Sequence, residues 1–295
     1  MNRERQGELF ILLQTPLWGL FPIITILTLN RLSPLISLVW STLFSCIFFA
    51  VVVSLKKKWR DLTNIAALKD VLWNVFFVGI LYYVLFFYGL QHTSAGNAGI
   101  IALTEVFFSF VFFHLWRRHF IPRVHILGAL LVLLGAVIVL FPTFTHFQIG
   151  DIFILVGVFF APFGNFFNQR ARKRISSEAI MFIRSALSAP LLFAIAFMLG
   201  ERNLTSKLYE SVTYLAINGI FLLGLSKLFW IEGIHRISVT KANALASISP
   251  LLTLLFAWLI LHNIPTAWQL LSLVPMVVGI KLLSTREPKN VPTAM

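Results

Sequence analysis

The chain has 295 residues, of which 58% are apolar, 15% aromatic and only 12% charged. Soluble domains are roughly half apolar and about a quarter charged, so this composition excludes a water-soluble globular protein. The 24 lysines and arginines against 11 acidic residues give a net charge of +13, which in a soluble protein would indicate nucleic-acid binding. The single cysteine, Cys46, lies in an apolar run, which excludes a disulfide framework and a cysteine-based metal site.

Ten apolar runs follow one another along the chain. A helix needs about 20 apolar residues to cross about 30 Å of hydrocarbon, and these runs are too long for barrel strands. We therefore predict an all-α integral membrane protein with ten transmembrane helices. The predicted spans are 9–29, 35–55, 71–90, 95–115, 125–141, 151–168, 179–199, 212–231, 239–261 and 267–283.

The basic residues gather in alternate connections between these spans. With both termini in the cytoplasm, 19 of the 24 lysines and arginines lie in cytoplasmic segments, three in outer loops, and two, Arg184 and Lys227, within spans. Cytoplasmic loops of membrane proteins collect Lys and Arg. We therefore predict a multi-pass protein of the inner (plasma) membrane with both termini cytoplasmic, and no nucleic acid is needed as a partner to explain the charge.

The second half of the chain repeats the first at an interval of about 144 residues. Residues 88–94 correspond to 232–238, and Glu105 falls within a residue of Pro250. Corresponding loops have opposite basic bias, because five spans per half invert the second half. The pattern predicts two inverted five-helix repeats (5+5), residues 1–147 and 148–285, followed by a short cytoplasmic tail at 286–295. Such repeats place a substrate site near the midplane between them.

Short motifs at matching places carry a resemblance to a known family. They are Pro16-Leu17-Trp18-Gly19, Leu32-Ser33-Pro34, His92-Thr93-Ser94-Ala95, Gly150-Asp151 and Ser249-Pro250. Across nearly its whole length the chain resembles an EamA-type member of the drug/metabolite transporter superfamily. The resemblance implies a ten-helix 5+5 inverted fold and a bacterial inner-membrane exporter of amino acids, metabolites or drugs.

The sequence departs from that family's pattern at several places. Glu105 stands where the fourth span usually has a proline, and Trp40 stands where the second span usually has an arginine, whereas its second-half counterpart Arg184 is kept. The acidic residue that often follows the fourth and ninth spans is missing at 116–119 and 262–263. The resemblance therefore carries over no generic substrate.

Three ionisable side chains lie within the predicted spans, where burial is costly and a role in a transport pathway is the default interpretation. Glu105 sits near the middle of its span, which favours proton coupling or recognition of a cationic substrate group; a structural salt bridge is the alternative. Lys227 and Arg184 lie nearer the cytoplasmic ends of their spans, so each either joins the site or extends to the interface. A pairing of Glu105 with Lys227 or Arg184 is a hypothesis.

Aromatic and helix-breaking residues supply further candidates. Trp18, Tyr83 and Trp230 could stack on a planar substrate or cover a cation, with ordinary packing as the alternative, and Asn165 could contact substrate directly. Pro16 in the first span lies at a position that corresponds to Pro162 and Gly164 in the sixth. Matching breakers predict interrupted helices that act as a hinge, with an ordinary kink as the alternative.

Several chemistries have no sequence motif. There is no Walker-type phosphate loop, the seven histidines have no metal-ligand spacing, and no nucleophile elbow or paired acidic motif is present, so we expect neither an enzyme nor a cofactor. We predict a secondary active exporter of small polar metabolites, such as amino acids or drug-like compounds, that works by alternating access among membrane lipids with protons as the candidate coupling ion. The alternatives are a lipid-linked flippase of the same fold and a non-transporting membrane assembly subunit. The oligomeric state stays open, a homodimer included.

Overall fold

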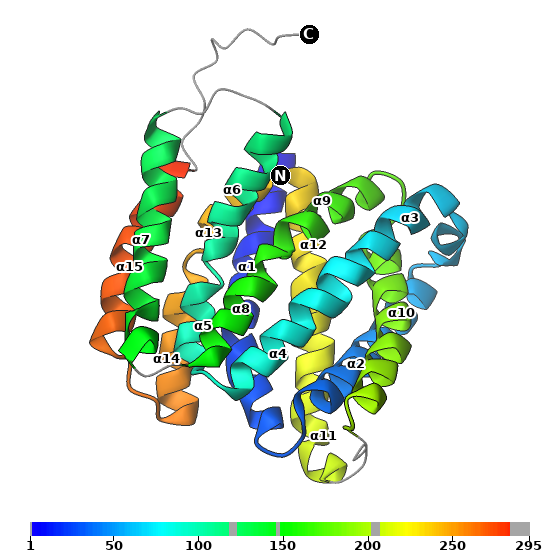
Figure 1. The fold of residues 1–295 in the computed structure, drawn as a ribbon. Helices are drawn as coiled ribbons and strands as arrows, with labels where there is room; N and C mark the ends of the chain where they lie inside the picture. Colours follow the sequence, from blue (N-terminus) through cyan, green and yellow to red (C-terminus); the bar gives the residue numbers. More distant parts are fainter. Residues whose placement is uncertain (1, 118–122, 146–147, 202–206, 284–295) are drawn as a thin grey trace, which may run out of the picture.

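The computed structural model describes residues 2–117, 123–145, 148–201 and 207–283 of the chain. Within these ranges every regular element is helical, as the all-α prediction requires. Figure 1 shows a bundle in which helices far apart in the sequence pack side by side. The predicted tail at 286–295 and the predicted repeat boundary at 147 lie outside the described residues.

The first half of the chain contains a long pair of helices, a short 3-10 turn, and then helices that are divided into segments. In chain order the elements are α1 (Arg3–Leu29), α2 (Pro34–Leu55), η1 (Trp59–Thr63), α3 (Ile65–Asn74), η2 (Val75–Tyr82), α4 (Tyr83–Gln91), α5 (Ala95–Ile101), α6 (Thr104–Arg117) and α7 (Arg123–Thr145).

The second half follows a similar order of whole and divided helices. Its elements are α8 (Ile149–Phe159), α9 (Ala161–Arg172), α10 (Ser177–Met198), α11 (Leu208–Ala216), η3 (Ile217–Leu225), α12 (Ser226–Arg236), α13 (Val239–Ala246), α14 (Ser249–Leu261) and α15 (Ala267–Leu283).

Among the described residues, nine helical stretches are long and apolar enough to cross a membrane, some of them built from consecutive segments. A shorter apolar helix, Ala267–Leu283, has 17 residues. The nine stretches are Arg3–Leu29, Pro34–Leu55, Ile65–Gln91, Ala95–Phe112, Arg123–Leu140, Ile149–Arg172, Ser177–Met198, Leu208–Arg236 and Lys241–Leu261. The chain is therefore a multi-pass membrane protein.

The third and eighth predicted spans are each longer than the sequence indicated. Their helices run over Ile65–Gln91 and Leu208–Arg236, because polar residues at the ends continue the helix and find ion partners there. Buried Asp70, for example, pairs with Arg170 and Arg174 at 3.2 Å each.

Two π-helical segments, η2 and η3, lie in the middle of these two long helices. Each contains a glycine at a close helix contact: a Cβ on Gly79 would collide with Ser188 of α10, and one on Gly219 would collide with the backbone of Ser41 in α2. Single π-helical turns inside α-helices are frequent at functional sites. Here they bring the third and eighth spans tightly against α10 and α2.

Three other helices are interrupted, and one of the breaks lies beside the predicted hinge residues Pro162 and Gly164. The chain turns at residue 160 just before Pro162, at 102–103 just before Glu105, and at 247–248 just before Pro250. The predicted interruption at Pro16 is wrong, because α1 continues through both Pro16 and Pro22. Membrane helices tolerate proline where the surrounding protein makes up for the missing N–H.

The main helix pairs join the two halves of the chain. Helix α1 packs on α12, α2 on α10, α4 on α8, and α7 on α15. Each pair combines one helix from residues 1–147 with one from residues 148–285. Side chains from both halves therefore face each other in the interior.

Candidate functional site

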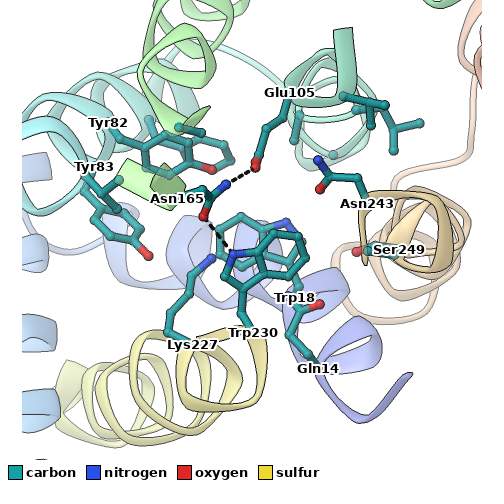
Figure 2. A pocket seen from close by; sticks show the side chains of 18 of the residues that line it. Gln14, Trp18, Tyr82, Tyr83, Glu105, Asn165, Lys227, Trp230, Asn243 and Ser249 are labelled. Carbon is teal, nitrogen blue, oxygen red and sulfur yellow. Dashed lines mark hydrogen bonds between the residues drawn. The ribbon is translucent and has the colours of Figure 1, made fainter. Parts of the chain in front are cut away.

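A cavity of about 80 Å³ lies between helices of both halves, and we call it the central cavity. Its walls come from α1, η2, α4, α5 and α6 of the first half and from α9, α10, α12, α13 and α14 of the second. This volume has room for a few water molecules. Figure 2 shows its polar and aromatic side chains pointing inward from these helices.

Seven side chains that the sequence analysis predicted for the site come together in this cavity. They are Trp18, Tyr83, Glu105, Asn165, Arg184, Lys227 and Trp230. The proposed hinge residues Pro16, Pro162 and Gly164 are not among the lining residues.

Glu105 is held by a hydrogen-bonded chain that crosses from one half of the protein to the other. The Asn165 side-chain amide donates to Glu105 Oε1 at 2.7 Å, and the Trp230 indole N–H donates to Asn165 Oδ1 at 2.9 Å (Figure 2). Because Asn165 uses both ends of its amide, it fixes the position of the carboxylate relative to Trp230. The local backbone helps, since the turn before Glu105 tightens through i→i−3 bonds and the Thr104 hydroxyl donates to the Ile101 carbonyl at 2.7 Å.

Lys227 turns into the cavity and does not extend to the membrane interface. Its Nζ lies 3.2 Å from the centroid of the Trp18 ring, a close cation–π contact. The Trp18 ring is in turn stacked on Phe21 at 4.7 Å. The Trp18 ring thus fixes the Lys227 amine beside the cavity.

Arg184 is buried, with 5% of its surface exposed, and it also faces the cavity. Its guanidinium lies 5.9 Å from the centroid of the Tyr83 ring. The tight contact of Gly79 with Ser188, one turn further along α10, brings Tyr83 next to this arginine. Sequence reasoning had left an interfacial position for Arg184 open, and its burial decides against that alternative.

The structure shows Glu105, Lys227 and Arg184 around one cavity without a direct ion pair joining the acid to either base, as far as the described residues extend. Glu105 instead accepts a hydrogen bond from the Asn165 amide, and Lys227 contacts the Trp18 ring. Glu105 and Lys227 nevertheless lie close enough to interact electrostatically, and their pairing stays a hypothesis. Three ionisable groups, one acid and two bases, thus line the cavity.

Sequence reasoning missed a set of uncharged amides that also line the cavity. Gln14, Asn168 and Asn243 are 2%, 4% and 6% exposed, and each has a side-chain amide atom with no hydrogen-bond partner among the described residues. Buried polar atoms are nearly always hydrogen-bonded, so such atoms indicate water or a ligand. The available signal was helical spacing, because Gln14 lies one turn before Trp18 and Asn168 lies three residues after Asn165.

The chemistry of the cavity suits binding more than bond-making. A carboxylate, an ammonium, a guanidinium and free amides around aromatic walls can recognise both signs of charge in a small polar molecule. In the part of the chain that the structure describes, no three His, Cys, Asp or Glu side chains gather as a metal site requires.

A bundle of membrane-crossing helices around a charged internal cavity is the architecture of a membrane transporter. The comparison with known families agrees with this class. The chain belongs to the EamA-like transporter family, whose family model matches residues 5–141 and again residues 148–285. The resemblance seen in the sequence motifs is confirmed.

Curated relatives are also transporters by name. An uncharacterized transporter of Methanothermobacter thermautotrophicus is 26% identical over 206 residues, which are 68% of this chain and 60% of that protein. The pseudopaline exporter CntI of Pseudomonas aeruginosa is 27% identical over 208 residues, which are 70% of this chain and 72% of the exporter. The matched part thus spans less than two thirds of the first relative's length.

The fold is shared with a protein of known crystal structure. The two chains superpose with a TM-score of 0.69 at 16% identity, covering 95% of this chain and 97% of the other. The whole helical arrangement, and not one half alone, is therefore common to both.

Proposed function

We propose that this protein is a secondary active exporter of small polar metabolites, such as amino acids or drug-like compounds, that works by alternating access. The observation that carries the proposal is the central cavity, where Glu105, Lys227 and Arg184 face one space inside a membrane-crossing bundle. Ionisable groups at such depth mark substrate and ion pathways. The named export activity of the Pseudomonas aeruginosa relative supports the outward direction.

The proposed architecture has ten spans in two inverted five-helix repeats, residues 1–147 and 148–285, with a tail at 286–295. Two matches to one family model support it, as do features that recur at equivalent places. The π-helical segments η2 and η3 are one such pair, and the breaks before Glu105 and before Pro250 are another. The pairing of helices across the halves is also what a pseudo-two-fold arrangement requires.

The proposed location is the inner (plasma) membrane, with both termini in the cytoplasm. The support is the distribution of Lys and Arg. The ends of α2, α9 and α12 gather many of them at one end of the bundle, whereas the described residues at the opposite end include hydrogen bonds to Asp151 and Glu201 and one ion pair, Arg31 with Glu210. Asn97 donates to Asp151, and Gln269 donates to Asn97 Oδ1 at 2.7 Å.

Recognition in this proposal uses both signs of charge. A substrate carboxylate would bind Lys227 and Arg184, a substrate ammonium would bind Glu105, and the free amides of Asn168 and Asn243 would take up remaining polar groups. A zwitterion satisfies all three charges at once. Small neutral or purely apolar molecules would leave buried charges unpaired, which is the basis of selectivity at such sites.

The size of the cavity supports alternating access. About 80 Å³ is too small for an amino acid with its hydration shell, so the helices must move apart on one side to load the site and on the other to release it. The interrupted helices beside Glu105, Pro162 and Pro250 are the proposed points of movement. Protonation of Glu105, which would weaken its hold on an ammonium group, is the proposed link to a proton gradient.

The experiment is transport by the purified protein in liposomes. Liposomes are preloaded with an equimolar mixture of the twenty amino acids and a set of small organic cations, and the external solution is analysed by mass spectrometry at two pH gradients. We expect release of a subset of polar compounds that protein-free liposomes retain. Movement of a fluorescent phospholipid between leaflets without solute release would identify a flippase instead, and no movement of either would identify a non-transporting subunit.

A further inference from the structure

A second and larger cavity, of about 670 Å³, opens at the end of the bundle where α9 and α12 finish (upper part of Figure 1). It shares no lining residue with the central cavity. Lys227 and Trp230 of α12 line the central cavity, whereas Leu228 and Glu232 of the same helix line the second one. We call this second space the basic groove, after its six cations Lys56, Lys58, Arg172, Lys173, Arg174 and Arg236.

Each acidic side chain of the basic groove already has a partner within the protein. Glu178 pairs with Lys56, and Glu232 pairs with Arg172 at 3.0 Å and with Arg236. The third acid, Asp61, accepts a hydrogen bond from the Ser176 backbone N–H at 2.9 Å.

Six cations against three acids leave the groove with an excess of positive charge. Lys58 and Lys173 are exposed, and neither forms a salt bridge within the described part of the chain, although the charge of Lys58 acts on nearby Asp61. Both ammonium groups at the mouth of the groove can therefore turn toward an anion.

The groove changes from charged to apolar with depth. Arg236 ends α12, and Leu228 lies eight residues earlier, about 12 Å deeper at 1.5 Å per residue. Phe10 and Phe229 face each other with ring centroids 5.9 Å apart, and the Arg236 guanidinium lies 5.0 Å from the centroid of the Phe10 ring. The groove thus has an apolar wall directly beneath its cations.

Side chains next to the groove place its mouth at the membrane surface. Trp59 follows Lys58 and is 46% exposed, as an aromatic residue at the interface would be. Leu55, at the end of α2, is 79% exposed, which suits contact with acyl chains. Lys58 and Lys173 are therefore at the level of lipid headgroups.

We propose that the basic groove binds an anionic phospholipid. The lipid phosphate contacts Lys58 and Lys173, and the upper part of an acyl chain lies against Phe10, Leu228 and Phe229. Basic pockets between membrane helices are known to take anionic headgroups, and this groove adds the apolar wall that a free phosphate ion does not need. This site is independent of the substrate cavity and of the identity of the substrate.

The test compares lipids with identical chains. Thermal unfolding of the purified full-length protein in detergent is followed while dioleoylphosphatidylglycerol, dioleoylphosphatidylcholine or inorganic phosphate is added. We expect saturable stabilisation by the phosphatidylglycerol only. The Lys58→Gln/Lys173→Gln variant should need about 30-fold more of this lipid for half of the effect, since each lysine near an anionic surface contributes roughly fivefold.

The matched control removes two exposed lysines that do not line the groove, in a Lys69→Gln/Lys281→Gln variant. This variant should respond to phosphatidylglycerol as the wild type does. Equal responses to both lipids, an unchanged response of the groove variant, or an equal loss in the control variant would each overturn the proposal. Stabilisation by inorganic phosphate as strong as that by the lipid would overturn the lipid as the occupant.

Discussion

Helix α12 separates two cavities that hold charged side chains in opposite ways. In the basic groove Glu232 accepts hydrogen bonds from Ser177, Arg172 and Arg236, so its charge is matched by cations. In the central cavity Glu105 is held by the neutral amide of Asn165 and faces no direct ion partner in this conformation.

The difference indicates what each set of charges is for. Ion pairs at the end of the bundle lie near water, where charge is inexpensive and pairing fixes the ends of helices to one another. Charges in the interior are costly unless something matches them, and neutral partners position them without cancelling them. The paired charges therefore hold helix ends together, whereas those of the central cavity are the ones that the proposed function assigns to a ligand.

The largest effect is expected from Lys227→Met. The substitution removes the cation that would bind a substrate carboxylate, and loss of one partner of a buried charge pair costs 2–5 kcal/mol, or at least about 30-fold in transport kcat/KM. Lys227→Arg keeps the charge and should retain a measurable rate. Liposome transport of the compound identified by the amino-acid panel provides the measurement, and a wild-type rate in the methionine variant would contradict a binding role.

A smaller loss is expected from Asn165→Leu. Glu105 would lose a hydrogen bond to its carboxylate, a contact typically worth about 1.5–3 kcal/mol, so half-saturation should shift by roughly 10-fold or more. Asn74 is a matched control, because it is equally buried, donates to the Gly164 carbonyl at 3.1 Å and does not line the cavity. Asn74→Leu should lower the unfolding temperature with little change in KM. A raised KM in Asn74→Leu together with an unchanged KM in Asn165→Leu would contradict the different roles of the two asparagines.

In the basic groove the expected effect is on stability and not on substrate affinity. Glu232→Gln leaves Arg172 and Arg236 without their carboxylate and should lower the free energy of unfolding by on the order of 2 kcal/mol. Glu210→Gln is the control, since its carboxylate is 60% exposed and lies 3.9 Å from Arg31. Exposed pairs of this kind are worth less than about 1 kcal/mol. Thermal unfolding and KM are measured together, and a raised KM with unchanged stability would contradict this assignment.

The smallest effect is a pH dependence at Asp61, outside the membrane-crossing helices. Burial raises the pKa of this carboxyl, but the hydrogen bonds from Ser176 and the charges of Lys58 and Arg172 outweigh burial and hold the pKa below its usual value. A lowered pKa in the folded state contributes stability above about pH 4 and loses it as the pH falls. The difference in unfolding temperature between wild type and Asp61→Asn should therefore shrink between pH 7 and pH 3. A difference that grows on acidification would have the wrong sign.

The membrane helices were predictable because hydrocarbon demands long apolar runs. The ends of these helices were harder to predict. The apolar run of the third span begins only after Lys69 and Asp70, whereas the helix already begins at Ile65, because Asp70 forms ion pairs with two arginines. Pro16 misled the prediction for a related reason. A proline in the sequence shows that one N–H is missing but not whether neighbouring groups make up for it.

The charged members of the central cavity were also predictable, because an ionisable group in a span is costly and so stands out. The amides of Gln14, Asn168 and Asn243 did not stand out, since an uncharged amide costs less to bury and often bonds within its own helix. The partners of the charges required the structure. No spacing in the sequence indicates that Asn165 lies against Glu105, or that Trp18 lies against Lys227.

The most direct test of the central claim is liposome transport by Glu105→Gln at two opposed pH gradients. The substitution keeps the shape of the side chain and its contact distance to Asn165 while removing the charge and the site of protonation. Wild-type transport should change with the gradient, and the variant should lose most of its rate and all of that dependence while unfolding at the wild-type temperature. A variant that transports at the wild-type rate with the same gradient dependence would contradict the role of the central cavity.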